Sequence, residues 1–400
     1  MKKVFSLILV SVLVLSICSL PATAQDTEEV PLTGESITVY NWGDYIANGE
    51  DGFIDVNKEF TKRTGIKVNY DTFATNEELY TKLKSGGSYY DVIIPSDYMI
   101  SKMIAEDMLE PLNYDNIPNA KFISEELKEH CGFDPEGKYS VPYAWGRVGI
   151  LYNEKYVDDP VDSWSILWNQ KYKNKILMFD NPRDAFGIAQ KKLGMSFNTN
   201  NPEDWRAAAE ELKIQKSNVN CQYVMDQIFS KMGNEEAYLA PYYAGDALTI
   251  YGDNPNVKFA IPKEGTNLFV DAMCIPKGSK NKEAAEKYIN FICETDIAFE
   301  NISYINYSSP HVKAAEMHKE YLAENFGDWA VEVIYPETLD GCETFIALDN
   351  ETYQLADRLW LEVRNSGDYT LTIILVIGAL ALLIGFIVFL RIKKHRRENA

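Results

Sequence analysis

Basic residues are scarce in this 400-residue chain. It has 39 Lys and Arg against 59 Asp and Glu, a formal net charge of −20. Residues 1–24 and 391–400 together hold seven basic residues and one acidic residue, so the rest of the chain has 39 − 7 = 32 basic and 59 − 1 = 58 acidic residues, a net of −26. Nucleic-acid binding needs a basic surface, so this balance argues against nucleic acid as a partner. An acidic surface instead attracts cations, although acidity that serves solubility alone is an open alternative.

Motifs for common catalytic and metal sites are also missing. The four histidines stand in no metal-binding spacing such as H-x-x-x-H. No G-x-S-x-G elbow, P-loop or G-x-G-x-x-G turn occurs. The sequence therefore gives little support to zinc or hydrolase chemistry, and we expect no metal, no cofactor and no enzymatic activity.

Cysteine is sparse as well. Beyond the first 24 residues the chain has five cysteines, an odd number, and no C-x-x-C pair. They are Cys131, Cys221, Cys274, Cys293 and Cys342. At most two disulfides could form. A chain of this length does not need them to fold, and we predict none.

The N-terminal apolar run is typical of a secretory signal peptide. Two lysines precede it, and Ala22-Thr23-Ala24 supplies a small-x-small cleavage pattern. We predict a signal peptide over residues 1–24, cleaved after Ala24, and a flexible polar leader over residues 25–35. A lipid attached at Cys18 is the alternative, and the bulky residue before that cysteine disfavours it.

A second apolar run near the C-terminus predicts a membrane anchor. Residues 371–390 carry no charge, and at about 1.5 Å per residue this length matches a bilayer core of roughly 30 Å. Five Lys and Arg follow in residues 391–400, and the positive-inside rule places them in the cytoplasm. We therefore expect a single-pass cell-membrane protein with its binding part on the extracytoplasmic side. A buried core helix is the alternative.

The stretch Tyr40-Asn41-Trp42-Gly43-Asp44-Tyr45 follows a short β-branched run that predicts a first strand. In open α/β sheets, ligands bind at the carboxyl ends of the strands, so these side chains would lie where a ligand lies. Aromatic faces and a carboxylate together suit an organic cation. An aromatic plug that closes one end of a sheet explains the same residues equally well.

Strands and helices alternate over the first third of the chain. Further strands are predicted at 66–70 and 91–95, each followed by a helical pattern. This order predicts a parallel sheet. An interruption at 141–146, before a new strand at 148–152, suggests a crossing into a second lobe, and residues 268–276 suggest the return. The expected lobes are residues 36–144 with 272–320, and residues 145–271 with 321–366.

Several predicted strand ends combine an aromatic residue with a carboxylate or a hydroxyl. They are Trp42/Asp44/Tyr45, Ser96/Tyr98, Asp180/Asp184, Tyr243/Asp246, Phe269/Asp271 and Tyr307. Each one alone is more often a core ring or a solvated turn acid. Together, at strand ends of both lobes, they predict a cleft lined for a cation.

At this point the chain resembles a known family. Between about residues 36 and 365 it is similar to the spermidine/putrescine-binding proteins of polyamine ABC transporters. The similar motifs are Tyr40-Asn41-Trp42, residues 64–68, Tyr90 to Ser96, Pro142 to Gly146, Ser163-Trp164 with Leu167-Trp168, and residues 280–283 through Asn290-Phe291. The resemblance implies a two-lobed α/β fold of the periplasmic-binding-protein type II that closes on its ligand by a hinge. To this fold we add the predicted transmembrane helix.

The resemblance also implies the ligand-binding residues. By position they are Trp42, Tyr45, Ser96, Tyr98, Asp184, Phe269, Asp271 and Tyr307, with Asp180, Tyr243 and Glu343 as looser matches. Tyr243 and Phe269 stand where the family has tryptophan, and Asn181 stands where one member has a second acid, with Asp180 beside it. One acid fewer favours a shorter diamine.

The expected function is capture of putrescine or spermidine by a monomer that delivers it to an ABC permease. Three alternatives stay open. The ligand could be another organic cation or an amino acid. The protein could be a sensor, which would need a partner because its cytoplasmic tail is short. It could also be an enzyme with Cys274 as nucleophile, although no histidine is an obvious partner.

Overall fold

The computed structural model describes residues 30–86 and 89–367. Its strands are β1 (Ser36–Trp42), β2 (Lys67–Phe73), β3 (Val92–Ile93), β4 (Ser140–Asn153), β5 (Leu177–Phe179), β6 (Gln222–Val224), β7 (Leu239–Tyr243), β8 (Val257–Ala260), β9 (Thr266–Cys274) and β10 (Cys342–Glu343). Its α-helices are α1 (Val56–Thr64), α2 (Asn76–Lys84), α3 (Asp97–Ala105), α4 (Glu125–Glu129), α5 (Pro182–Lys192), α6 (Pro202–Val219), α7 (Gln227–Gly233), α8 (Ala244–Asp253), α9 (Lys282–Ile292), α10 (Thr295–Ile305), α11 (Val312–Asn325), α12 (Asp328–Ile334) and α13 (Asn350–Asn365).

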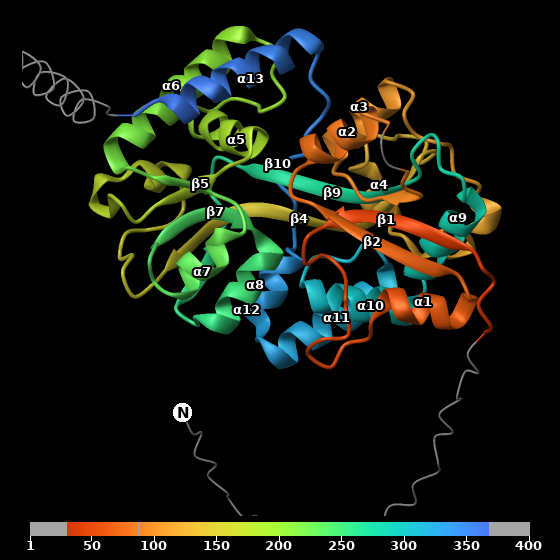
Figure 1. Cartoon of the computed structure of the whole chain (residues 1–400). Coiled ribbons are helices and arrows are strands. Elements are labelled where there is room, and N and C mark those ends of the chain that lie inside the picture. The colour runs from red at the N-terminus through yellow and green to blue at the C-terminus, as the bar shows by residue number, and fades with distance from the viewer. Residues whose placement is uncertain (1–29, 87–88, 368–400) are drawn as a thin grey trace, which may run out of the picture.

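Two long antiparallel strands connect the halves of the molecule. The main sheet has the order β2-β1-β3-β9-β4-β7, with β8 and β10 paired to β4 and β9. The pairs β1–β2 and β1–β3 are parallel, as predicted, whereas β4 and β9 are antiparallel to each other. Figure 1 shows β4 and β9 running across the middle of the molecule, with α1 to α4 on one side and α5 to α8 on the other.

The predicted break at 141–146 does not occur in β4, which is one strand of 14 residues. Its first half pairs with β9 and its second half with β7 and β8. The register shifts between Pro142 and Ala144. A bulge tolerates a proline, because the missing N–H then costs no ladder hydrogen bond. The proline that suggested a break therefore marks an irregularity inside a continuous crossing strand.

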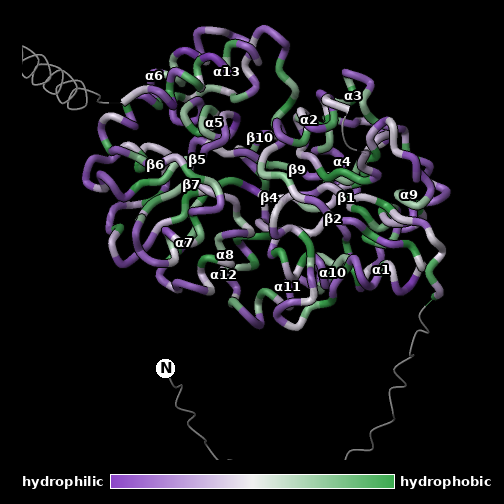
Figure 2. Tube along the Cα trace, in the orientation of Figure 1, coloured by the Kyte–Doolittle hydropathy of each residue, from purple (hydrophilic) through white to green (hydrophobic). Residues whose placement is uncertain are grey.

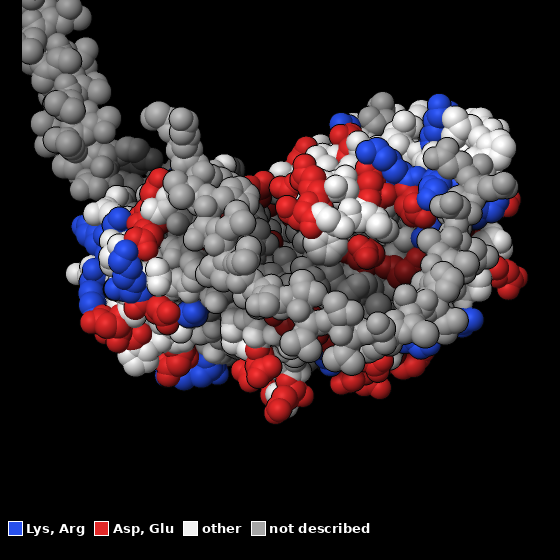
Figure 3. Space-filling model, turned by 90° about the horizontal axis from the view of Figure 1, so that it is seen from below, with Lys and Arg blue, Asp and Glu red and all other residues white. Residues whose placement is uncertain are grey.

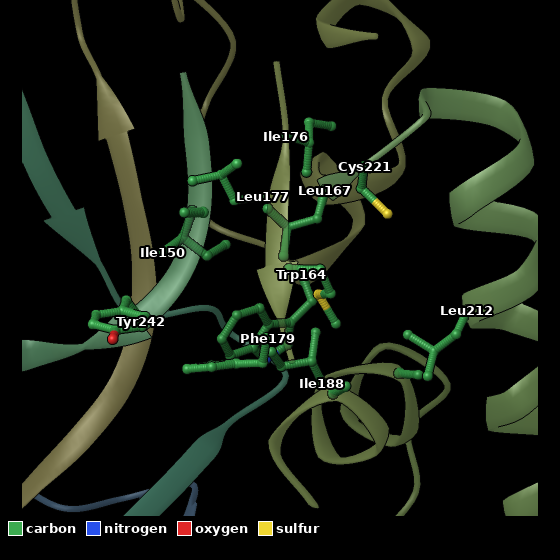
Figure 4. Packing of buried hydrophobic residues seen from close by; sticks show 14 of the residues in the cluster. Ile150, Trp164, Leu167, Ile176, Leu177, Phe179, Ile188, Leu212, Cys221 and Tyr242 are labelled. Atoms are coloured by element: carbon green, nitrogen blue, oxygen red, sulfur yellow. The ribbon is translucent and has the colours of Figure 1, made fainter. Parts of the chain in front are cut away.

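Each half has its own hydrophobic core. One core gathers residues of β5, α5, α6, β7 and α13, and two adjoining clusters gather residues of β1, α1, β3, α3, β9 and α9. Figure 4 shows the first core, where Trp164 and Phe179 pack near Ile188 of α5. Figure 2 shows apolar residues concentrated in the central strands and polar residues on the outer helices. The two-lobed α/β fold agrees with the prediction, while the residue boundaries of the lobes stay a prediction.

The end of α1 shows how the sequence sets local structure. Asp55 caps the helix by accepting a hydrogen bond from Lys58 N at 2.9 Å. Gly65 ends it with φ 73°, and a Cβ there would meet Pro31 O at 2.4 Å. The described part of the predicted leader is bonded to this helix end, because Val30 N donates to Lys62 O and Thr33 N donates to Gly65 O.

The prediction of a transmembrane helix at residues 371–390 is corrected. Over residues 30–86 and 89–367, no helix combines the length and the apolar character that crossing a membrane requires. Residues 371–390 lie outside this described part, as do the predicted signal peptide at 1–24 and the basic tail at 391–400. The fold that the described residues support is the two-lobed α/β arrangement.

Candidate functional site

A cavity of about 350 Å³ lies where the strand ends of both lobes meet. Nine of the eleven predicted ligand-binding residues line it. They are Trp42, Tyr45, Ser96, Tyr98, Asp184, Tyr243, Phe269, Asp271 and Tyr307. These residues are as much as 265 positions apart in the sequence, and the crossing of β4 and β9 brings them together.

The structure places the other two predicted residues, Asp180 and Glu343, away from this cavity. The Asp180 carboxylate forms an ion pair with Arg364 at 3.1 Å. Glu343 pairs with Lys191 and accepts a hydrogen bond from Ser196 at 2.8 Å. Both carboxylates therefore have protein partners, and their predicted role as ligand contacts has no geometric support.

Three aspartates in the cavity each accept a hydrogen bond from one tyrosine. Tyr45 donates to Asp271 at 2.8 Å and Tyr243 donates to Asp184 at 2.8 Å. In the third pair, Tyr307 donates to Asp246 at 2.9 Å. Asp184 and Asp271 are buried, and Asp246 is partly buried. We call these contacts the three Tyr–Asp pairs.

Local structure holds each aspartate in place. Asp184 lies in the first turn of α5 and Asp246 in the first turn of α8, where the helix dipole favours a negative charge. Asp271 lies in β9 and forms an isolated antiparallel bridge with Ser96. Its Oδ1 atom is buried and has no hydrogen-bond partner within the described part of the chain. That oxygen is thus free to accept a donor from a ligand.

The loop that carries Tyr45 is fixed from two sides. Asp44 has a left-handed backbone with φ 48°, which turns the chain sharply after Gly43. Asn41 Nδ2 then donates to Tyr45 O at 3.2 Å, and Ala47 N donates to the Asn301 side chain at 3.0 Å. The aromatic and acidic stretch after the first strand is therefore a built wall of the cavity.

Removal from water dominates the titration of the three aspartates. Burial raises the pKa of Asp184 to about 7 and the pKa of Asp271 to about 6. Removal from water is also the largest cause that raises the pKa of Asp246 to about 7. In each case the hydrogen bond from the tyrosine opposes the rise. Burial also raises the pKa of the three partner tyrosines well above the usual range, so they stay protonated donors.

Aromatic rings form the rest of the wall. Tyr243 and Phe269 are 5.4 Å apart between ring centroids, and Phe269 and Tyr307 are 5.9 Å apart. Trp42 packs on Phe73 at 4.6 Å, and its indole N–H is buried without a hydrogen-bond partner among the described residues. Flat rings of this kind suit methylene chains and attract cations to their faces.

Ser96 and Tyr98 are held by one asparagine. Asn76 Nδ2 donates to Ser96 Oγ at 3.1 Å and to Tyr98 Oη at 3.2 Å. Tyr98 in turn donates to Glu77 at 3.0 Å. The Tyr98 hydroxyl is therefore engaged by protein groups, and its ring is what it offers to a ligand.

The described lining of the cavity contains seven carboxylates and no Lys or Arg. The acids are Asp44, Glu78, Asp97, Asp184, Asp226, Asp246 and Asp271. The thiol considered as a nucleophile, that of Cys274, is fully buried in β9 and does not line the cavity. Burial also raises its pKa well above the usual range, so the geometry gives the enzyme alternative no support.

Several residues that line the cavity are not among the predicted ligand-binding residues. Asp246 belongs to the predicted aromatic-plus-acid set, beside Tyr243, but the resemblance did not place it among the ligand-binding residues. Asn76, Asp97 and Phe345 also line the cavity. Asp97 is fully buried and accepts a hydrogen bond from its neighbour's backbone, Tyr98 N, at 2.6 Å. No sequence signal distinguishes Phe345, because it lies in a connection without regular structure.

A larger groove of about 920 Å³ lies between the described leader, α1 and β2. Lys58 and Lys62 line it together with Asp44 and Asp55. Its mixed charges and its position at the edge strand make it a poorer candidate than the smaller cavity, where rings and carboxylates from both lobes converge.

Fold and cavity together define a two-lobed α/β protein with an acidic, ring-lined cavity between its lobes. The family model described as bacterial extracellular solute-binding protein matches residues 56–325. The chain belongs to this family.

Named relatives narrow the comparison. The chain is 35% identical over 285 residues to the spermidine/putrescine-binding periplasmic protein of Salmonella typhimurium, a match that covers 71% of this chain and 80% of the relative. It is 31% identical over 347 residues to the putrescine-binding periplasmic protein SpuD of Pseudomonas aeruginosa, covering 82% and 91%.

Among solved structures, the chain is similar to the spermidine/putrescine ABC transporter substrate-binding protein PotD of Streptococcus pneumoniae. The TM-score is 0.69 at 35% sequence identity, and the match covers 82% of this chain and 98% of PotD. The resemblance stated from the sequence motifs is thus confirmed.

Proposed function

We propose that this protein captures polyamines such as putrescine and spermidine outside the cytoplasm and delivers them to an ABC permease. The relatives named for these ligands support the proposal, as does the cavity. One observation carries it. Three aspartates, each fixed by a tyrosine, share one aromatic cavity whose described lining contains no basic side chain.

Buried charges need partners. An unpaired buried carboxylate is costly, and its pKa rises until it is partly neutral. A protonated amine supplies the missing charge and donates the missing hydrogen bonds, as at the free Oδ1 of Asp271. The methylene groups between the amines fill the space between the rings. A polyamine therefore satisfies the charge and the apolar surface of this cavity together.

An amino acid fits the cavity less well. Its carboxylate would need a cation or several N–H donors, and the described lining offers seven acids and no Lys or Arg. The chain is strongly acidic, so its surface charge also attracts cationic ligands at longer range. Figure 3 shows clusters of Asp and Glu over one face, beside smaller basic patches.

The expected affinity follows from a few contacts. A cation–π contact contributes about 0.5–2 kcal/mol, and a hydrogen bond to a charged group about 1.5–3 kcal/mol. Several of these, less the costs of ordering and closure, reach about −8 kcal/mol, which corresponds to a Kd of about 1 μM.

Isothermal titration calorimetry tests the proposal. The purified protein is titrated with putrescine, spermidine, agmatine and a set of amino acids at about pH 8, where the three aspartates are ionised. We expect micromolar or tighter binding for at least one polyamine and none for the amino acids. Binding of an amino acid with no binding of any polyamine would refute the proposal.

A further inference from the structure

A buried arginine stands next to the ligand-facing Asp184. Arg183 is only 5% exposed, and it makes no ion pair within the described part of the chain. Burial lowers the pKa of its guanidinium, and its Nε atom lacks a hydrogen-bond partner among the described residues. Burying an unpaired charge is costly, so Arg183 is expected to have a specific role. Arg183 does not itself line the cavity.

Arg183 forms hydrogen bonds that hold part of the connection between β10 and α13. Its Nη2 donates to Ile346 O at 3.0 Å and to Asn198 Oδ1 at 3.1 Å, and its Nη1 donates to Phe197 O at 3.1 Å. Asn198 completes the grip, because it accepts from Ile346 N at 3.1 Å and donates to Thr344 O at 2.8 Å. We call residues 344–346 the clamped segment.

The clamped segment presents one ring to the cavity. Phe345 lines the cavity and is 4% exposed. The Arg183 guanidinium lies 4.5 Å from the centre of that ring. The Tyr98 ring is also near Phe345, at 6.1 Å between centroids, and the Arg183 guanidinium lies 5.9 Å from the centre of the Tyr98 ring. Since Tyr98 belongs to α3 and Arg183 to α5, Phe345 is a wall held between the two lobes.

Arg183 also brings a positive charge close to Asp184. Asp184 faces Tyr243, Glu77 and Asp271 from three other elements, and of these groups Glu77 and Asp271 favour its neutral form. The Arg183 cation acts in the opposite direction and favours the ionised form of Asp184. An ionised Asp184 is what an incoming amine requires.

Given the proposed function, we propose that Arg183 is a positioning residue of the binding site. Its fork fixes Phe345 as the wall between the lobes, and its charge, adjacent in sequence to Asp184, favours the carboxylate form that pairs with the amine of a polyamine. The two effects are separable, because geometry needs the fork and the electrostatic effect needs only a cation.

Three variants separate them. Arg183→Lys keeps the charge and loses the fork, Arg183→Met loses both, and Asn198→Ala weakens the grip while Arg183 stays. Two readouts are measured for each variant. The first is the pKa of the Asp184 carboxyl, followed by carbon NMR in the ligand-free protein. The second is the dissociation rate of spermidine, followed by stopped-flow fluorescence.

We expect Arg183→Met to raise the Asp184 pKa and to speed dissociation about tenfold or more, a loss of about 1.4 kcal/mol. Arg183→Lys and Asn198→Ala should speed dissociation while the Asp184 pKa stays close to that of the wild type. Lys192→Met is the matched control, since Lys192 lies on the same helix and pairs with Glu211 at 2.6 Å. It should change neither readout.

An unchanged Asp184 pKa in Arg183→Met would overturn the electrostatic part, and wild-type dissociation rates in both Arg183→Lys and Asn198→Ala would overturn the clamp. If Arg183→Met does not fold, Arg183→Lys and Asn198→Ala still decide the clamp. The NMR titration needs no ligand. It therefore tests Arg183 even if the wild type binds no polyamine, a result that would count against the proposed function alone.

Discussion

At the scale of single residues, the Tyr–Asp pair is the repeated unit of the cavity. Each tyrosine donates one hydrogen bond to its aspartate and holds the carboxylate without neutralising it. A lysine or arginine in the same place would form an ion pair that a ligand would have to break. Hydroxyl partners thus orient the acids and leave their charge to the ligand.

The first prediction concerns Asp271. Replacing it with asparagine removes a charge and leaves a neutral partner, so polyamine affinity should fall about tenfold or more. Asp180→Asn is the matched control, because Asp180 pairs with Arg364 outside the cavity. Calorimetry should show wild-type affinity for that control. Equal losses in the two variants would contradict the placement of the site.

The second prediction concerns pH. Two of the aspartates have a pKa raised to about 7 and Asp271 has one raised to about 6, while amines stay protonated up to about pH 10. Binding favours the ionised carboxylates, so it releases protons, and affinity weakens as pH falls through about 7 to 6.

We expect affinity at about pH 5.5 to be at least about tenfold weaker than at about pH 8. Calorimetry in buffers of different ionisation enthalpy should show proton release near neutral pH, and less release for Asp184→Asn. A flat affinity across this range would show that the aspartates are already ionised without ligand.

Single residues also show where sequence reasoning stops. The aromatic-plus-acid pattern at strand ends named twelve residues, and eleven of them line the cavity. It could not tell Asp184 from Asp180, four positions earlier, because facing the cavity or facing Arg364 depends on where α5 begins. Arg183 and Phe345 gave no signal at all, since their contact joins segments 162 positions apart.

At the scale of elements, the start of α8 shapes the third Tyr–Asp pair. Gly245 lies in the first turn of this helix, and a Cβ there would meet the Tyr307 ring at 2.5 Å. The absence of a side chain lets the ring lie against the helix so that its hydroxyl reaches Asp246, one residue further on.

The third prediction is therefore that Gly245→Ala displaces Tyr307 and breaks its contact with Asp246. We expect weaker polyamine binding and a loss of about 1–3 kcal/mol in stability, the usual cost of overpacking. Gly252→Ala in the same helix is the control, because a Cβ there meets nothing within 4 Å. Calorimetry should show wild-type polyamine affinity for Gly252→Ala, and thermal unfolding should show equal or slightly higher stability. Equal behaviour of both variants would contradict the tight packing of Tyr307.

Elements with local signals were predicted well. The caps at Asn201-Pro202 and Gly65 mark the start of α6 and the end of α1. The predicted break in β4 failed for a long-range reason. Pairing with β9, β7 and β8 keeps the strand continuous past Pro142. Most of the paired residues are 100 or more positions apart in the sequence.

At the scale of the whole molecule, the crossing strands β4 and β9 tie the lobes together beside the cavity. The residues that line the cavity come from both sides, with Tyr45 and Ser96 on one and Asp184 and Tyr243 on the other. A ligand bound to both sets favours the closed arrangement by its differential contacts.

The fourth prediction is that a polyamine compacts the molecule. Small-angle X-ray scattering should show a smaller radius of gyration with saturating spermidine than without it. Asp271→Asn at the same spermidine concentration should show a smaller change, since fewer molecules are occupied. Identical scattering of the wild type with and without ligand would contradict closure by a hinge.

The most direct test of the central claim is a crystal structure of the protein with spermidine. The account predicts the ligand inside the 350 Å³ cavity, with its nitrogens within hydrogen-bond distance of Asp184, Asp246 or Asp271 and its methylene groups against the rings. Spermidine bound elsewhere, or in the cavity with its nitrogens away from all three aspartates, would contradict it.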